Sequence, residues 1–239
     1  MSSTATMPIF DVLREQTSIV HQRTLEHPTV RGIGDGSLPD ETFRFYLEQD
    51  FQFLLRFVRV LAIAASAAPD LESMAQLSRL VSSTVDVEID ALRDLYGRFG
   101  GDPQLLGGVI PSPTCEAYCN HLLASVYERD LLVSLAAILP CHWGYHDIGL
   151  HLMDKGLPED GRYAAWIEEY ASDEYGELVH WTIGRFNELG EGASRQQLDA
   201  ATRAFDLSCR YELGFWEMAW NRETWPDSTI SSSPDTGRG

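Results

Sequence analysis

The chain has 239 residues, of which 44% are hydrophobic and 23% are charged, and 36 acidic against 18 basic residues give a formal net charge of −18. This apolar content is that of a folded globular protein and excludes a disordered acidic chain. The acid excess argues against nucleic acid as a partner, because it repels phosphate backbones, and mildly favours a small cationic ligand.

The apolar segments are too short to cross a membrane. The nearest candidate, Val58–Ala68, falls well short of the roughly 20 residues that a transmembrane helix needs. The first residues, MSSTATMP, have neither the basic start nor the apolar core of a secretory signal. We therefore predict a cytoplasmic protein without membrane contact, whose four cysteines are reduced thiols.

A hydrophobic period of about 3.6 residues dominates the chain, and strand-like alternation is scarce, which predicts an all-α fold. Proline, glycine and capping residues mark the helix ends. Between the first two helices, the glycines at 32, 34 and 36 predict a turn, and Ser37 is the expected N-cap of the helix that follows. The predicted helices span about residues 8–26, 39–68, 71–99, 112–128, 130–155, 158–189 and 194–222.

Neither an internal repeat nor a shift in composition marks a domain boundary. Helices joined by short loops predict a single-domain bundle over residues 1–225. The remaining residues, 226–239, have no apolar anchor, and we predict a disordered C-terminal tail.

Two carboxylates lie where the helical period requires apolar side chains. Asp50 has aromatic and aliphatic residues three and four positions away on both sides, and Glu212 has Phe215 and Trp216 on its face. A buried, unpaired carboxylate is costly, so each acid must find a partner, shift its pKa or face a cavity. Hydrogen bonds within the core and an internal polar pocket both remain possible.

Cys141 follows Pro140 inside an otherwise helical segment. Proline removes a backbone donor and bends the helix, which would let the thiol point into a cavity. A lone buried cysteine often serves only as a small hydrophobic residue. Near two carboxylates, however, a thiol can be a nucleophile with an acid/base partner.

Three tyrosines, Tyr118, Tyr145 and Tyr170, fall among apolar residues on further predicted helices. Each by itself is an ordinary core residue. Together with the two acids they could line a slot for a flat heteroaromatic ligand, whose faces stack on rings and whose edge bonds to carboxylates.

The histidines raise the possibility of a metal site. His142 and His146 are four residues apart, and Glu177-x-x-His180 has the spacing found in di-iron bundles. Such a site needs a second Glu-x-x-His unit, which is missing, and Cys115 with Cys119 lacks the second ligand pair of structural zinc. We predict neither a metal nor another cofactor.

With these features combined, the chain resembles the TenA, or thiaminase II, family over nearly its whole length. The resemblance is carried by FYLEQDFQFLLRF at 45–57, PSPTCEAYCNHL at 111–122, LPCHWGY at 139–145, WIEEY at 166–170 and YELGFWEMAW at 211–220. It implies an all-helical fold like that of haem oxygenase, without haem or metal, assembled as a homotetramer or homodimer.

The resemblance also implies roles for single residues. Cys141 matches the catalytic cysteine, Glu212 the C-terminal active-site glutamate and Asp50 the aspartate that binds the pyrimidine. Family members commonly have a tyrosine three residues after that aspartate, where this chain has Phe53, so a hydroxyl near thiol and substrate is lost. The implied pocket rings are those of Tyr118, Tyr145, Tyr170 and Phe215.

The family hydrolyses 4-amino-5-aminomethyl-2-methylpyrimidine to the hydroxymethyl compound in thiamin salvage, and it also cleaves thiamin. The resemblance therefore implies an aminopyrimidine aminohydrolase, a hydrolase of carbon–nitrogen bonds, in which Cys141 adds to the pyrimidine and Glu212 moves protons. Alternatives are a non-catalytic protein that binds pyrimidines or regulates, or an oxidase of the same fold.

Overall fold

Every regular element in residues 7–226, the part of the chain that the computed structural model describes, is helical, which confirms the all-α prediction. The predicted tail, apart from Pro226, lies outside these residues. The elements are α1 (Ile9–Gln16), α2 (Ser18–Leu25), α3 (Pro28–Gly34), α4 (Asp40–Ala67), α5 (Leu71–Ser83), the π-helical turn η1 (Thr84–Glu88), α6 (Ile89–Arg98), the 3₁₀ turn η2 (Pro103–Gly108), α7 (Pro113–Tyr127), α8 (Leu131–Lys155), α9 (Gly161–Tyr170), α10 (Asp173–Glu191) and α11 (Arg195–Asn221).

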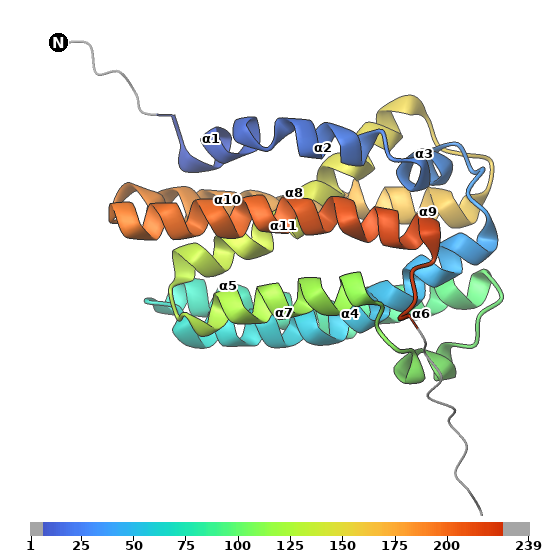
Figure 1. Cartoon of the computed structure of the whole chain (residues 1–239), viewed down its shortest axis with the longest axis horizontal. Coiled ribbons are helices and arrows are strands. Elements are labelled where there is room, and N and C mark those ends of the chain that lie inside the picture. Colours follow the sequence, from blue (N-terminus) through green and yellow to red (C-terminus); the bar gives the residue numbers. More distant parts are fainter. Residues whose placement is uncertain (1–6, 227–239) are drawn as a thin grey trace, which may run out of the picture.

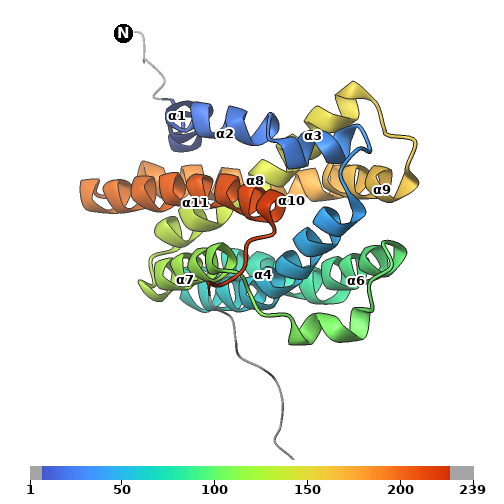
Figure 2. The same cartoon turned by 45° about the vertical axis from the view of Figure 1, so that its right-hand side comes forward.

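The helices form two layers, with α8 crossing between them (Figures 1 and 2). One layer holds α10 and α11, covered on the outside by α1 and α2, and the other holds α4, α5 and α7. Helix α8 contacts α11, α10, α9 and α7. It is therefore buried along its first half, from Leu131 to Tyr145, on every side. A cysteine in this half lies at the centre of the molecule.

Short helical elements replace parts of the predicted pattern near the N-terminus. The predicted turn is instead the helix α3, whose N-cap is His27 and whose first residue is Pro28. Gly34 permits close packing there, because a Cβ on it would lie 2.6 Å from the Leu152 side chain. Only Gly36 of this segment has a positive φ, +72°. These glycines thus serve mainly helix packing, which sequence spacing alone does not distinguish from a turn.

The predicted N-cap at Ser37 is also wrong. Pro39 occupies the N-cap position of α4 and makes no side-chain capping bond. The backbone N–H of Ser37 instead donates to Asp35 Oδ1 at 2.9 Å, so this segment forms a separate local turn.

Three predicted helices are interrupted in the structure. The first divides at Thr17, whose hydroxyl donates to the Leu13 carbonyl. The sixth divides where Ser172 caps α10 by accepting from the Tyr175 N–H. The third contains the π-helical turn η1 between α5 and α6. Each of these interruptions, a hydroxyl bond, an N-cap or a π-helical turn, extends over about one turn, so the hydrophobic period of the sequence does not show it.

We expect Asp130→Ala to lower the free energy of unfolding by about 1–2 kcal/mol, the usual loss for an N-cap. Asp130 caps α8 by accepting from the N–H groups of Leu132 and Val133, and its other oxygen accepts from Gln197 Nε2 on α11. Urea unfolding measures the change. Asp199→Ala, which breaks only an exposed ion pair, should cost less than about 0.5 kcal/mol; equal losses in the two variants would contradict the capping role.

Within the described residues, no helix combines the length and the apolar run that crossing a membrane demands.

Candidate functional site

Asp50 lies on α4 in the centre of the core and is buried. Its Oδ2 atom is 3.3 Å from the Tyr46 hydroxyl, which is also 3.3 Å from the Tyr145 hydroxyl of α8. Burial, followed by the charges of Glu88 and Glu212, raises the pKa of Asp50 well above its usual range, and the Tyr46 hydrogen bond opposes this rise. The surroundings of Asp50 thus favour its neutral, protonated form over the charged form.

Glu212 approaches from α11 and is also buried. Its Oε1 accepts a hydrogen bond of 2.5 Å from the Tyr118 hydroxyl of α7. Burial raises the pKa of Glu212 to about 7, although the hydrogen bond from Tyr118 lowers it. A carboxyl with a pKa near neutrality can both take up and release a proton, as a general acid and base must.

Cys141 is 8% exposed, and the charges of both predicted acids, Asp50 and Glu212, affect its thiol. Burial raises the pKa of its thiol well above the usual value, and the negative charges of Glu212, Glu88 and Asp50 raise it further. Glu212 acts in the same way on Asp50. The thiol and the two acids, far apart in sequence, therefore lie close enough to interact. The thiol is protonated at neutral pH and needs a base to become a nucleophile.

The predicted aromatic residues connect these groups. The Phe53 ring lies 5.1 Å from that of Tyr118 and 5.8 Å from that of Phe215, between centroids. On the other side, the Tyr145 and Tyr170 rings are 4.8 Å apart. All eight predicted site residues are buried, and they come from α4, α7, α8, α9 and α11. The structure brings the whole predicted set into one region.

A cavity of about 180 Å³ opens from this region between α4, α6 and α9. Its wall includes Asp50, Tyr170, Trp166 and, from η1, Glu88. Of the predicted site residues, Asp50 and Tyr170 belong to the wall, and Cys141 and Glu212 do not. A volume of this size suits a single substituted ring rather than a larger molecule.

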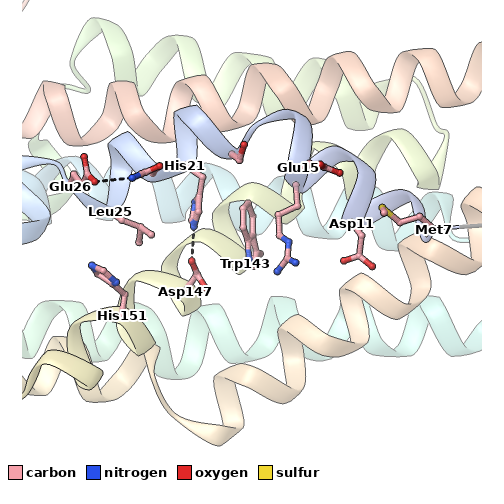
Figure 3. A pocket seen from close by; sticks show the side chains of 12 residues that line it. Met7, Asp11, Glu15, His21, Leu25, Glu26, Trp143, Asp147 and His151 are labelled. Atoms are coloured by element: carbon pink, nitrogen blue, oxygen red, sulfur yellow. Dashed lines mark hydrogen bonds and ion pairs between the residues drawn. The ribbon is translucent and has the colours of Figure 1, made fainter.

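A larger groove, of about 810 Å³, runs along α1, α2 and α8 (Figure 3). His21 in its wall stacks on Trp143 at 4.2 Å between ring centroids, and its Nε2 lies 2.6 Å from Asp147 Oδ2. None of the predicted site residues lines this groove. His21 and Trp143 also line a small adjoining pocket together with Glu212, so the groove borders the candidate site.

The residues considered for a metal do not form a set of three ligands in the part of the chain that the structure describes. In residues 7–226, no three His, Cys, Asp or Glu side chains are grouped as metal ligands. Burial lowers the pKa of His142 to about 4, and His146 Nδ1 lies 2.7 Å from the Tyr170 carbonyl oxygen. Cys115 Sγ donates to the Gln49 carbonyl. These side chains serve helix packing.

Sequence reasoning missed three residues of the site. Tyr46 bonds to Asp50, Tyr175 packs edge-on against Tyr170 at 5.2 Å, and Glu88 shares the cavity with Asp50. Glu88 could have been found as Asp50 was, as an acid on an apolar helical face, because it lies four residues before the buried Leu92. Tyr175 had none, since it lies in the first turn of α10, just after a break that the periodicity does not show.

Comparisons with known proteins find relatives over most of the chain. A model of the TENA/THI-4/PQQC family matches residues 14–222. An aminopyrimidine aminohydrolase from Halalkalibacterium halodurans is 35% identical over 216 residues, which cover 89% of this chain and 96% of that protein. The solved structure of a TenA homologue from P. horikoshii OT3 has a TM-score of 0.83 at 31% identity and covers 90% of this chain and 99% of its own.

A fourth comparison concerns the fold alone. A solved domain with a heme oxygenase-like fold from Shewanella denitrificans has a TM-score of 0.70 at 12% identity, covering 89% of this chain and 92% of its own. The predicted likeness to the haem oxygenase fold is thereby confirmed. Because the family model extends from α1 to the end of α11, the chain belongs to the TENA/THI-4/PQQC family.

Proposed function

We propose that this protein is an aminopyrimidine aminohydrolase of the thiaminase II type, without a cofactor. It hydrolyses 4-amino-5-aminomethyl-2-methylpyrimidine to the hydroxymethyl compound and ammonia in thiamin salvage, and it can also cleave thiamin. The relative from Halalkalibacterium halodurans bears the name of this activity. The observation that carries the proposal is that Cys141, Asp50 and Glu212 are all buried on three helices that pack against one another, α8, α4 and α11.

The reaction uses the thiol as a covalent catalyst. Glu212 accepts the Cys141 proton as the sulfur adds to C6 of the pyrimidine, and electrons move through the ring to expel the amine from the exocyclic methylene. Water then adds to that methylene, and the sulfur leaves as the ring regains aromaticity. Glu212 gives its proton back to the Cys141 sulfur as the sulfur leaves. The net reaction therefore consumes one water and releases ammonia.

The remaining residues bind and orient the ring. Asp50 bonds the amino and ring-nitrogen edge of the pyrimidine, and the rings of Tyr118, Tyr145, Tyr170 and Phe215 enclose its faces. Phe53 packs between Tyr118 and Phe215 and offers no hydroxyl to the substrate.

Incubation of the purified protein with the aminomethylpyrimidine tests the activity. We expect equal amounts of ammonia, from a coupled assay, and of hydroxymethylpyrimidine, from mass spectrometry. Tight binding by calorimetry without any product would identify a non-catalytic binding protein instead. Stoichiometric iron by elemental analysis, with oxygen consumption, would favour an oxidase.

Tyr118→Phe should move the acidic limb of the pH profile of kcat/KM to higher pH. Glu212 must be ionised to accept the thiol proton, so activity rises as pH passes its pKa. The hydrogen bond from Tyr118 lowers that pKa, and its loss raises it above about 7. Tyr211→Phe is the control, since the Tyr211 ring stacks on Tyr118 at 5.3 Å and packs against His121 at 5.5 Å, and its loss of a hydroxyl should leave the limb in place. A limb that stays in place in both variants contradicts the role of Glu212 as base.

The assembly we propose is a homotetramer in the cytoplasm. Exposed apolar side chains such as Ile19, Leu71 and Trp220 are available for contacts between copies. A catalytic thiol must also stay reduced, as it does in the cytoplasm. Light scattering should give about four times the 26.8 kDa of one chain; twice that mass would indicate the homodimer.

A further inference from the structure

Glu88 is an acid that the proposed reaction does not use. It is the last residue of η1, the π-helical turn between α5 and α6, and single π-turns occur often at functional sites. Its side chain belongs to the wall of the 180 Å³ cavity, together with Trp166 and Tyr170 of α9. Burial raises the pKa of Glu88 to about 7. The half-buried carboxyl therefore lines the same cavity as Asp50.

The surroundings of Glu88 supply no cationic side chain as a partner. Among the residues of the cavity wall, the acids Asp50, Asp94 and Glu169 accompany it, and Arg98 is the single cation. Arg98 donates to the Gly161 carbonyl, and no ion pair within residues 7–226 includes Glu88. A half-buried acid without a cationic partner is harder to ionise than one in water, so its site favours a cationic ligand.

Glu88 also lies near the catalytic groups. Its charge raises the pKa values of Asp50, Cys141 and Tyr170, which places it within electrostatic range of all three. Asp50 takes the ring edge in the proposed binding mode and Glu212 moves protons. The aminomethyl group, a primary amine that is protonated at neutral pH, remains without a counter-charge.

We propose that Glu88 binds the ammonium leaving group of the substrate and so makes the site select the cationic aminomethyl compound over its neutral hydroxymethyl product. This inference rests on the proposed function. Held in the ammonium form, the amine leaves as neutral ammonia when the carbon–nitrogen bond breaks, with the bonding electrons staying on nitrogen. The product lacks the charge, so the same residue helps it to leave.

Calorimetry in a Cys141→Ser background, which prevents turnover, separates the two ligands. Adding Glu88→Gln should weaken binding of the aminomethylpyrimidine by about 10–100-fold, the loss expected for a hydrogen bond between charged groups, and change binding of the hydroxymethyl compound by less than about twofold. Glu169→Gln is the control, because this exposed acid lines the same cavity and should change both by less than about twofold.

Equal weakening of both ligands, or no change in either, would overturn the role of Glu88. If Glu88→Gln fails to fold by circular dichroism, Glu88→Asp provides the test. The Glu88→Asp side chain is shorter by one methylene, so it should weaken binding of the aminomethyl compound alone. Unchanged binding of both compounds would count against the proposal. Failure of the proposed function would give another result: neither pyrimidine would bind to the Cys141→Ser protein, or the wild-type protein would release no ammonia.

Discussion

Replacing Cys141 by serine should lower kcat for ammonia release by about 10³-fold or more, because loss of a nucleophile removes the covalent route altogether. Serine has nearly the same size, and Cys141 lies in the interior of α8, so the fold should remain. The hydroxyl is a much poorer nucleophile than the thiol and is harder to deprotonate, and the three nearby carboxylates disfavour an anion at this position. The coupled ammonia assay measures the loss.

Cys115→Ala is the matched control. Cys115 is a buried thiol of α7 that donates to a backbone carbonyl, and it has no role in the proposed chemistry. Its variant should keep kcat within about threefold of wild type, by the small effect expected of a change outside the reacting groups. Undiminished turnover by Cys141→Ser, measured beside this control, would remove the proposed nucleophile.

Glu212→Gln should lower kcat by about 10²–10⁴-fold, the usual contribution of a general acid or base. Glutamine keeps an oxygen for the Tyr118 hydroxyl and fits the same space, but it cannot accept the thiol proton. The pH profile should also lose the limb that the pKa of Glu212 produces near 7.

The same substitution should make the protein more stable at neutral and higher pH. The pKa of Glu212 is about 7 when folded and near its usual 4.5 when unfolded, so the folded state holds the proton more tightly. Below about pH 4.5 the carboxyl is protonated in both states and does not change the free energy of unfolding. As pH rises from 4.5 toward 7 the carboxyl lowers this free energy increasingly, and above pH 7 the loss stays constant. Removing it should add roughly 1–3 kcal/mol at pH 8 and almost nothing at pH 4.

Glu217→Gln controls both measurements. Glu217 lies on the same helix, is exposed and bonds to His27, which lowers its pKa. Its replacement should leave kcat unchanged and bring no gain in stability. If Glu212→Gln keeps full activity, or loses stability at pH 8, then Glu212 is a structural hydrogen-bond partner rather than an acid/base group.

Much of the site was visible in the sequence because a polar residue on an apolar helical face is anomalous wherever the helix lies. Asp50 and Glu212 stand out in this way, and both are buried. The meeting of the two acids with Cys141 cannot be found by periodicity, since it depends on how α4, α8 and α11 cross. Here the family resemblance supplied what local patterns lack.

The sequence by itself determined the helical class and the extent of the long helices, because the 3.6-residue period, the prolines and most caps act over a few residues. Only the tertiary structure decided which face each helix buries, where the cavity opens and which acids share it. Burial and charge interactions depend on distances between segments far apart in the chain. Glu88 illustrates this, because its environment is created by α4 and α9 rather than by its own turn.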